Sequence, residues 1–409
     1  MLPDPPALIQ RFREVFGRLP QRLAVAPGRV NLIGEHTDYN GLPVFPMAID
    51  RVVAVAFRPR RDRRVCLSNL EDRFPPVEFE LSDAIPPGEP GGWGNYPRAA
   101  GQALWREIGP LTGLEGIVGS TVPVAAGLSS SSALVVATAL ALLDATGAAM
   151  ERARLAELLA RGERYVGLQG GGMDQTVSLC ARAGHALLIG FQPALELTPV
   201  PLPGDWRVVI ASSMVEAAKA AGTRDAYNDR VRECREALAR FAAAHGPEPA
   251  PADYAGLLSR WDAEEAIRLA DATLDDVLGR RFHHVVSEGA RVAEAVAAMR
   301  AGDLARFGEL LSASHASLRN DYAVSCAELD ELVHIAEAAG ASGARLTGAG
   351  FGGCIVAATR TERAEGVMHA LWRDFYHPRS VSTRHRNQLV FLATAAGGAR
   401  LEALPEGHA

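Results

Sequence analysis

Ionisable and polar side chains are concentrated in one short segment near the N-terminus, residues 27–41. This segment holds Arg29, Glu35, His36 and Asp38 between two apolar stretches. Because each unpaired polar group costs about 1–3 kcal/mol when it is buried, an ordinary core strand would not hold so many. These residue types suit a ligand that is anionic or rich in hydroxyl groups; a solvated loop is the alternative. The glycines of the segment favour the ligand, because glycine lets the backbone approach a bound molecule closely.

A run of serines stands at the start of a strongly apolar stretch that is typical of a long helix. The run and the residues before it are Gly127, Leu128, Ser129, Ser130, Ser131 and Ser132. A helix N-terminus offers unpaired N–H groups and the positive end of the helix dipole, so this start suits a phosphate group. An elaborate N-cap is the structural alternative. The lysine of a Walker loop is absent, so this is a different phosphate motif.

Two further glycine-rich segments, residues 167–175 and 345–354, are ambiguous when each is taken alone. The first ends in Gly-Gly-Met-Asp174, and an acid beside a tight turn is often only a helix cap. The second would fit a turn between a helix and a strand.

Hydrophobic periodicity predicts the elements that must position these segments. In the first half we expect helices at 8–19, 96–108, 129–146 and 151–166, and strands at 22–26, 44–57, 64–68, 114–122, 185–191 and 206–211. In the second half we expect helices at 220–243, 254–272, 283–301, 303–318, 326–339 and 362–376, strands at 354–358 and 388–394, and a frayed tail at 395–409. The 409-residue length and a proline-rich stretch near 199–203 predict an α+β protein with two domains, 1–205 and 206–409.

Composition excludes several classes of protein. The formal net charge of −6 argues against non-specific binding to nucleic acid, which depends on neutralising phosphates. We find neither a run of about 20 apolar residues nor a signal-peptide pattern, so we expect no membrane span and no export by that route. The five cysteines are dispersed and form no C-x-x-C pair, which favours reduced thiols and a cytoplasmic location.

In this order the segments resemble the motifs of galactokinases, which are members of the GHMP small-molecule kinase superfamily. Residues 27–41 resemble the galactokinase signature, and 127–134 and 345–354 resemble the second and third superfamily motifs. The resemblance spans nearly the whole chain. It implies a mixed-sheet N-terminal domain and a ferredoxin-like C-terminal domain with extra helices. It also implies transfer of the γ-phosphoryl group of MgATP to the C1 hydroxyl of α-D-galactose, which gives galactose 1-phosphate and ADP.

The resemblance further implies a role for each site residue. The catalytic residues would be Asp174, beside the C1 hydroxyl, and Arg29, beside Asp174 and the phosphoryl group. The sugar would be bound by Glu35, His36, Asp38, the backbone of Gly171, and Tyr227. ATP would be bound by the segment from Gly127 to Ser132, and Mg²⁺ by Ser130 and Glu163. Trp93 would lie on the adenine side, with a core tryptophan as an equal alternative. The expected partners are thus ATP and galactose or a related hexose.

The identity of the sugar stays open at this point. The order Asn40-Gly-Leu-Pro-Val44 departs from the usual galactokinase pattern, and Asn320 replaces a customary aspartate. Three segments, 127–134, 170–175 and 215–221, look closer to the branch that includes N-acetylgalactosamine kinase. A kinase for that or another sugar is therefore the alternative. A non-catalytic sensor of galactose and ATP ranks lower, because the phosphate motif is intact.

Overall fold

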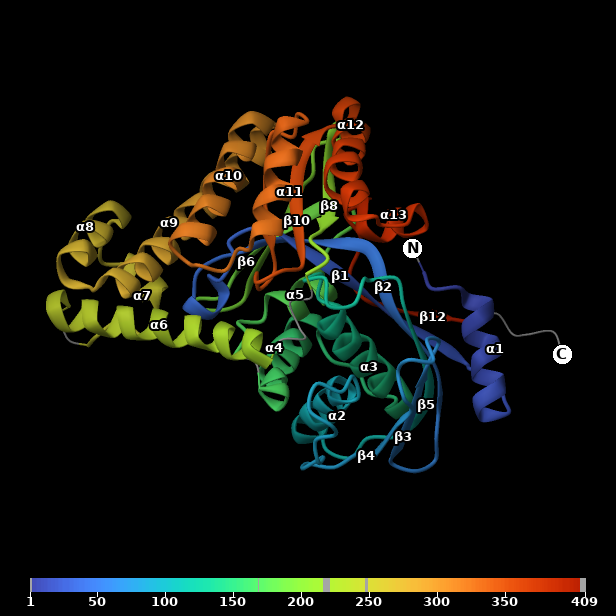
Figure 1. Cartoon of the computed structure of the whole chain (residues 1–409). Coiled ribbons are helices and arrows are strands. Elements are labelled where there is room, and N and C mark those ends of the chain that lie inside the picture. Colours follow the sequence, from blue (N-terminus) through green and yellow to red (C-terminus); the bar gives the residue numbers. More distant parts are fainter. Residues whose placement is uncertain (1, 168, 216–220, 247–248, 405–409) are drawn as a thin grey trace.

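Two β-sheets organise the chain: the main hydrophobic core extends from the first sheet to one face of the second, and another core covers the second sheet's opposite face (Figure 1). The computed structural model describes residues 2–167, 169–215, 221–246 and 249–404. The first sheet and its helices occupy the lower right of Figure 1, the second sheet lies above them, and an arm of helices extends to the left. This arrangement confirms the expected two-domain α+β fold.

The first sheet is mixed, with the strand order β12-β1-β2-β5-β3-β4. Its strands are β1 (Arg22–Ile33), β2 (Phe45–Pro59), β3 (Arg64–Asn69), β4 (Val77–Glu80), β5 (Leu114–Ser120) and β12 (Arg400–Ala403). β3 and β5 are parallel, and the other neighbours are antiparallel. Alternate residues of β1 face opposite sides. Leu23 and Val25 pack with α1 (Pro5–Phe16), whereas Ala24 and Ala26 join the main core.

The main core lies between this sheet and the helices α2 (Asn95–Ile108), α3 (Ser130–Thr146), α4 (Arg152–Gly162) and α5 (Met173–Cys180). α3 is apolar almost all round because it contacts α2 and α5 as well as β1 and β2. A hairpin of β6 (His185–Gly190) and β7 (Glu196–Pro201) closes one end, where Val44 bridges to Ile189. The packing thus buries α3 while its serine-bearing start stays at one end of the sheet.

The second sheet is antiparallel, in the order β11-β8-β10-β9. Its strands are β8 (Trp206–Ser212), β9 (Gly343–Thr347), β10 (Cys354–Arg360) and β11 (Val390–Ala393), and it packs against α11 (Ala327–Ala338) and α12 (Thr361–Leu371). A single helix was expected at 362–376. α12 instead ends at Leu371 and is followed by a π-helical turn at Trp372–Tyr376. The short helix α13 (Arg386–Leu389) precedes β11.

The arm of helices comprises α6 (Ala221–His245), α7 (Tyr254–Leu258), α8 (Ala263–Thr273), α9 (Asp276–Ala301) and α10 (Leu304–Asn320). α9 contacts α6, α8 and α10 along its length and reaches β1 (Figure 1). α10 packs directly on β9. The arm therefore connects the second sheet to the strand that begins the first.

The C-terminal segment differs from the frayed tail that was expected. Residues 400–403 form β12 and pair with β1 from Arg22 to Val25, so the prediction of a frayed tail was wrong for them. Their sequence, Arg-Leu-Glu-Ala, alternates over only four residues, too few to indicate a strand, and the edge of β1 supplies the hydrogen bonds. The expected boundary at 205/206 falls directly before β8, while β12 returns to the first sheet. Within the described residues, no helix is long and apolar enough to cross a membrane.

Candidate active site

Arg29 and Asp174 form a paired cation and carboxylate where β1 meets the start of α5. Arg29 Nε donates to Asp174 Oδ1 at 2.7 Å, and its Nη2 lies 2.7 Å from the same oxygen. Its Nη1 donates to the Gly127 carbonyl at 2.6 Å. Ser178 on α5 donates to the Pro27 carbonyl at 2.8 Å, which ties the helix of Asp174 to the strand of Arg29. The two sequence-predicted catalytic residues are thus in direct contact, 145 positions apart in the chain.

The serine run begins α3 and faces the same carboxylate. Gly127 has φ 72° and Ser129 has φ 58°, so the backbone passes through left-handed conformations before the helix starts. The Ser129 hydroxyl donates to Asp174 Oδ2. Ser132 donates to Glu163 at 3.1 Å, and Ser130 and Ser131 form the first turn, half-buried. The predicted phosphate-binding residues therefore surround the Arg29–Asp174 pair.

Three carboxylates, Asp38, Glu163 and Asp174, are close enough to repel one another. Burial raises the pKa of Glu163 to about 7, and the Asp174 carboxylate adds to this rise. Burial also raises the pKa of Asp38 to about 6, again with help from Asp174. Among the described residues no group of three or more His, Cys, Asp or Glu could hold a metal by itself. A cation bound by one carboxylate, serine and phosphate oxygens would relieve this repulsion, which fits the habits of Mg²⁺.

The turn that holds Glu35 and His36 is buried between the two domains. Arg345 Nη2 donates to Glu35 Oε2 at 2.8 Å, and the Gly348 N–H donates to the same oxygen at 3.0 Å. Burial raises the pKa of Glu35, although the Arg345 guanidinium opposes this rise. One carboxylate oxygen of Glu35 is therefore already engaged by the protein, and within the part of the chain that the structure describes Oε1 has no hydrogen-bond donor, which makes it the candidate atom for a ligand.

Asp38 lies against the turn that precedes α5. The Gly171 N–H donates to Asp38 Oδ2 at 3.1 Å. A Cβ atom on Gly171 would lie 2.4 Å from the backbone of Asp38 and Tyr39, so this close approach requires glycine. Asp38 and Gly171, both predicted to bind sugar, are thus in contact.

His36 and Tyr227 meet in an aromatic cluster at the side of this turn. Their ring centroids are 5.5 Å apart, and the rings of Tyr39 and Tyr322 lie 5.9 Å and 4.7 Å from that of His36. His36 adopts φ 63°, which non-glycine residues rarely do. The structure thus brings His36 close to Tyr227 and Asp38 close to Gly171 and Asp174.

Sequence reasoning missed the residues that hold this turn in place. Glu288 on α9, fully buried, accepts from the N–H groups of Gly34 and Glu35 at 2.9 and 3.2 Å and from Ser314 at 2.7 Å. His284 Nε2 lies 3.1 Å from the Glu35 carbonyl. Arg345 opens the glycine-rich motif that the sequence did single out, but Glu288 and His284 lie mid-helix with no local signal.

The third glycine-rich motif contacts the phosphate loop backbone to backbone. A Cβ atom on Gly348 would lie 2.7 Å from the Gly127 carbonyl, and Gly348 has φ 87°. Because the same carbonyl accepts from Arg29 and the Gly348 N–H binds Glu35, this glycine joins the sugar-side turn to the phosphate loop.

Trp93 lies just before α2, partly buried against the main core, and its indole N–H donates to the Pro75 carbonyl at 2.9 Å. Three residues later, Tyr96 interacts with Ser131 and, through charge, with Glu163, while burial raises the pKa of its phenol. Among the described residues Trp93 makes no hydrogen bond to the phosphate loop or to the Arg29–Asp174 pair, so its adenine-side role stays a prediction. Of the segment 215–221 noted above, residues 216–220 lie outside the described residues.

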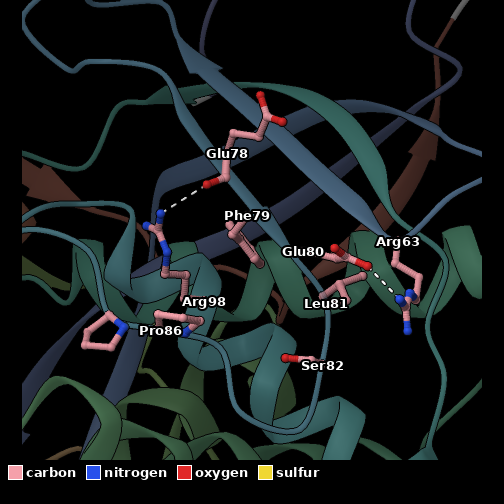
Figure 2. Close-up of a pocket in the computed structure, with 9 residues that line it drawn as sticks. Arg63, Glu78, Phe79, Glu80, Leu81, Ser82, Pro86 and Arg98 are labelled. Carbon is pink, nitrogen blue, oxygen red and sulfur yellow. Dashed lines mark hydrogen bonds and ion pairs between the residues drawn. The ribbon is translucent and has the colours of Figure 1, made fainter.

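A separate hollow of about 550 Å³ lies beside the edge strand β4 (Figure 2). Figure 2 shows Arg98 bonded to the Glu78 carbonyl on one side and Arg63 paired with Glu80 on the other. The residues that line it include none of the predicted site residues. Its arginines are already partnered within the hollow.

Comparison with known proteins gives concordant results. The family model described as "GHMP kinases N terminal domain" matches residues 95–182, "GHMP kinases C terminal" matches 295–377, and "Galactokinase galactose-binding signature" matches 10–59. Galactokinase of Roseiflexus sp. (strain RS-1) is 41% identical over 403 residues, covering 97% of this chain and 96% of that protein. Human galactokinase is 39% identical over 399 residues, covering 95% and 94%. The crystal structure of Lactococcus lactis galactokinase complexed with galactose superposes with a TM-score of 0.83 at 32% identity, covering 96% and 98%.

These findings place the chain in the class of GHMP small-molecule kinases, because both halves match that superfamily and the whole fold superposes on one of its members. Within that class the signature at residues 10–59 and the full-length identities are specific: the chain belongs to the galactokinase family. The resemblance noted from the sequence motifs is thereby confirmed. The mevalonate kinase of Methanococcus jannaschii, with a TM-score of 0.60 at 18% identity, shares the fold alone.

Proposed function

We propose that this protein is an ATP-dependent galactokinase, which transfers the γ-phosphoryl group of ATP to the C1 hydroxyl of α-D-galactose and gives galactose 1-phosphate and ADP. The observation that carries the proposal is the contact of Arg29 with Asp174, between the start of α3 and the turn of Glu35 and His36. Phosphoryl transfer depends mainly on positioning and on stabilising charge on the transferring oxygens. A buried arginine beside a helix N-terminus supplies both.

Asp174 orients the attacking hydroxyl and accepts its proton. A carboxylate that already accepts from Arg29 and Ser129 is a weak base for an alcohol, so its proton moves late, as the bond to phosphorus forms. Arg29 offsets the negative charge on the phosphoryl oxygens. The Ser129–Ser132 segment and the N–H groups of the first turn of α3 hold the phosphates.

Ser130 and Glu163 are the proposed Mg²⁺ ligands. The raised pKa of Glu163, about 7, supports this assignment, because a bound cation would stabilise the ionised carboxylate that burial and Asp174 disfavour. Mg²⁺ would supply charge neutralisation on the phosphate oxygens. Trp93, three residues before the Tyr96 that interacts with Ser131, is the proposed adenine-side residue.

Glu35, His36, Asp38, Tyr227 and the Gly171 backbone are proposed to recognise the sugar. A site of buried polar groups rejects analogues that leave those groups unpaired, and such a loss often exceeds the discrimination of apolar pockets. The proposed location is the cytoplasm, which the five free cysteines support.

A product assay tests the proposal directly. The protein is incubated with MgATP and, separately, galactose, N-acetylgalactosamine, glucose and arabinose, and sugar 1-phosphate is detected by phosphorus NMR, with Asp174→Asn as the matched inactive control. We expect a C1 phosphate signal with galactose that is absent from the Asp174→Asn sample. A signal with N-acetylgalactosamine alone would reassign the substrate, and no product from any sugar would refute kinase activity and favour a sensor.

A further inference from the structure

Four side chains form a hydrogen-bonded chain that leads away from the site, behind the turn of residues 34–36. His36 Nδ1 lies 2.8 Å from the Tyr39 hydroxyl, which lies 2.7 Å from the Tyr322 hydroxyl. The Tyr322 hydroxyl lies 3.0 Å from Cys234 Sγ. The chain joins the N-terminal domain to α6 and to the segment after α10. The catalytic steps proposed above use none of these contacts.

Each hydroxyl in this chain has one proton, so the protons must all point the same way along it. The stronger hydrogen bond at one end of the hydrogen-bonded chain determines this direction. A neutral imidazole nitrogen is a strong acceptor and a phenol is a good donor, whereas a thiol is weak both as donor and as acceptor, so the imidazole end determines the order. The favoured order therefore runs from the Cys234 thiol to Tyr322, from Tyr322 to Tyr39, and from the Tyr39 hydroxyl to Nδ1 of His36. Consecutive bonds in one direction strengthen each other.

A neutral His36 ring carries one proton, either on Nδ1 or on Nε2. Burial lowers its pKa to about 3, and the neighbouring His284 adds to this effect, so the ring is neutral near pH 7. Its Nε2 atom is buried and makes no hydrogen bond of normal geometry with the described residues, but the Ala349 backbone interacts with the ring and opposes the fall in its pKa. Because an unpaired buried polar atom is costly, a proton on Nε2 needs an acceptor, either this backbone or a ligand oxygen.

We propose that Cys234, Tyr322 and Tyr39 fix His36 as the tautomer that carries its proton on Nε2, so that this nitrogen is a hydrogen-bond donor. The three are positioning residues: they act through His36 and do not touch the substrate. The partner of Nε2 is then an oxygen that accepts, such as a sugar hydroxyl oxygen, and this last step rests on the proposed function. The tautomer itself is a property of the free protein.

Nitrogen-15 NMR of protein labelled at histidine tests the tautomer without substrate or activity. The protein has 11 histidines, so the His36 signal is identified by its absence from a His36→Gln sample. We expect the shift of an unprotonated nitrogen at Nδ1 and of a protonated one at Nε2. In Tyr39→Phe the Nδ1 donor is gone, and we expect the two nitrogens to move toward a mixture of tautomers. A proton on Nδ1 in the wild type, or an unchanged signal in Tyr39→Phe, would overturn the proposal.

Tyr254→Phe is the matched control, because this buried phenol donates to the Cys234 carbonyl, outside the hydrogen-bonded chain. We expect it to leave the His36 signal unchanged. In Cys234→Ser the hydroxyl still donates, so the tautomer is expected to survive. In kinetic assays we expect Tyr39→Phe to raise the sugar KM about tenfold, with kcat and the ATP KM little changed. Because the spectra need no turnover, failure of the galactokinase proposal would leave the tautomer test intact.

Discussion

Arg29 makes three contacts from one guanidinium group, two with Asp174 and one with the Gly127 carbonyl. Its side chain is 6% exposed, so these contacts are shielded from water. The planar fork lets one side chain hold the carboxylate and the phosphate loop at fixed positions, which a lysine ammonium cannot do. The function of this residue thus depends on geometry as well as on charge.

We therefore expect Arg29→Ala to lower kcat by about 10²–10³-fold, because a preorganised charge that stabilises the transition state is lost. The sugar KM is expected to change little, and Arg29→Lys to recover only part of kcat. Arg61→Ala, at an exposed arginine in the loop between β2 and β3, serves as the control and should behave as wild type. Steady-state kinetics with both substrates varied would measure this, and an unchanged kcat in Arg29→Ala would refute the assignment.

Without a bound metal, the ionised Glu163 carboxylate of the proposed metal site destabilises the folded protein. Its pKa in the folded protein, about 7, is above its ordinary value of 4.5. Between these values the folded state binds more protons than the unfolded state, so the free energy of unfolding falls as the pH rises through this range. The metal-free protein is therefore destabilised by this group above pH 7 and not below pH 4.5.

Replacing this carboxylate by a neutral amide should remove that cost. We expect Glu163→Gln, without nucleotide or metal, to raise the Tm by roughly 3 °C at pH 8 and by less at pH 5. The same variant should lose most of its MgATP-dependent turnover. Calorimetry at the two pH values checks this, with the exposed Glu157→Gln as control. A lower Tm than wild type at pH 8 would contradict the stated origin of the pKa shift.

α10 and β9 approach each other at two glycines, and this close packing supports the sugar-side turn. A Cβ atom on Gly308 would lie 2.0 Å from the Ser342 carbonyl oxygen, and one on Gly343 would lie 2.0 Å from the Gly308 carbonyl oxygen. Along the same two elements, Ser314 donates to Glu288 and Arg345 donates to Glu35. The spacing of helix and strand therefore sets where the partners of residues 34–36 lie.

A matched pair of helix substitutions tests this spacing. We expect Gly308→Ala to destabilise the protein by about 2–3 kcal/mol, because α10 must move away from backbone atoms. Gly366→Ala on α12 meets nothing within 4 Å and should stabilise by about 0.5–1 kcal/mol. Thermal unfolding measures both. If the two variants unfold at the same temperature, the close approach of α10 to β9 is not a constraint.

Local pattern was sufficient for the elements that bury an apolar face. α3, α9 and β2 were predicted from their long apolar patterns, whereas β1 was predicted only at 22–26 and extends to Ile33 through the polar site segment. The short strands β4, β7 and β12 were missed, since their pairing partners, and not their own residues, determine them. In the site, the sequence grouped Arg29, Asp174 and the serines by motif. Glu288 could not be found, because its role arises from contacts 253 and 254 positions away.

The segment from Ala395 to Ala403 ties the whole molecule together. Ala396 donates to the Ala48 carbonyl, Gly398 to Ala181 and Ala399 to Ser178, at 2.9, 2.8 and 2.7 Å. It then forms β12 against β1. Because α5 carries Asp174 and β1 carries Arg29, this segment is hydrogen-bonded to both elements that carry the proposed catalytic residues.

Truncation after Thr394 should therefore affect both stability and activity. We expect the Tm to fall by roughly 5 °C or more and kcat to fall at least about tenfold, since β1 loses its edge partner and α5 its backing. Truncation after Leu404 leaves β12 intact and is the control. Calorimetry and initial rates compare the two, and wild-type behaviour of the shorter protein would show that the segment is dispensable.

The position of β12 also has a consequence for biosynthesis. β12, which completes the first sheet, is translated after all four strands of the second sheet. Residues 1–205 therefore emerge from the ribosome while one edge of β1 is still unpaired. Such an edge is a template for pairing with other chains, and contacts so distant in sequence form slowly. The N-terminal half therefore stays prone to aggregation until β12 is translated, since β12 begins at Arg400, well after residue 205. Chaperone dependence of the nascent chain is the expected result.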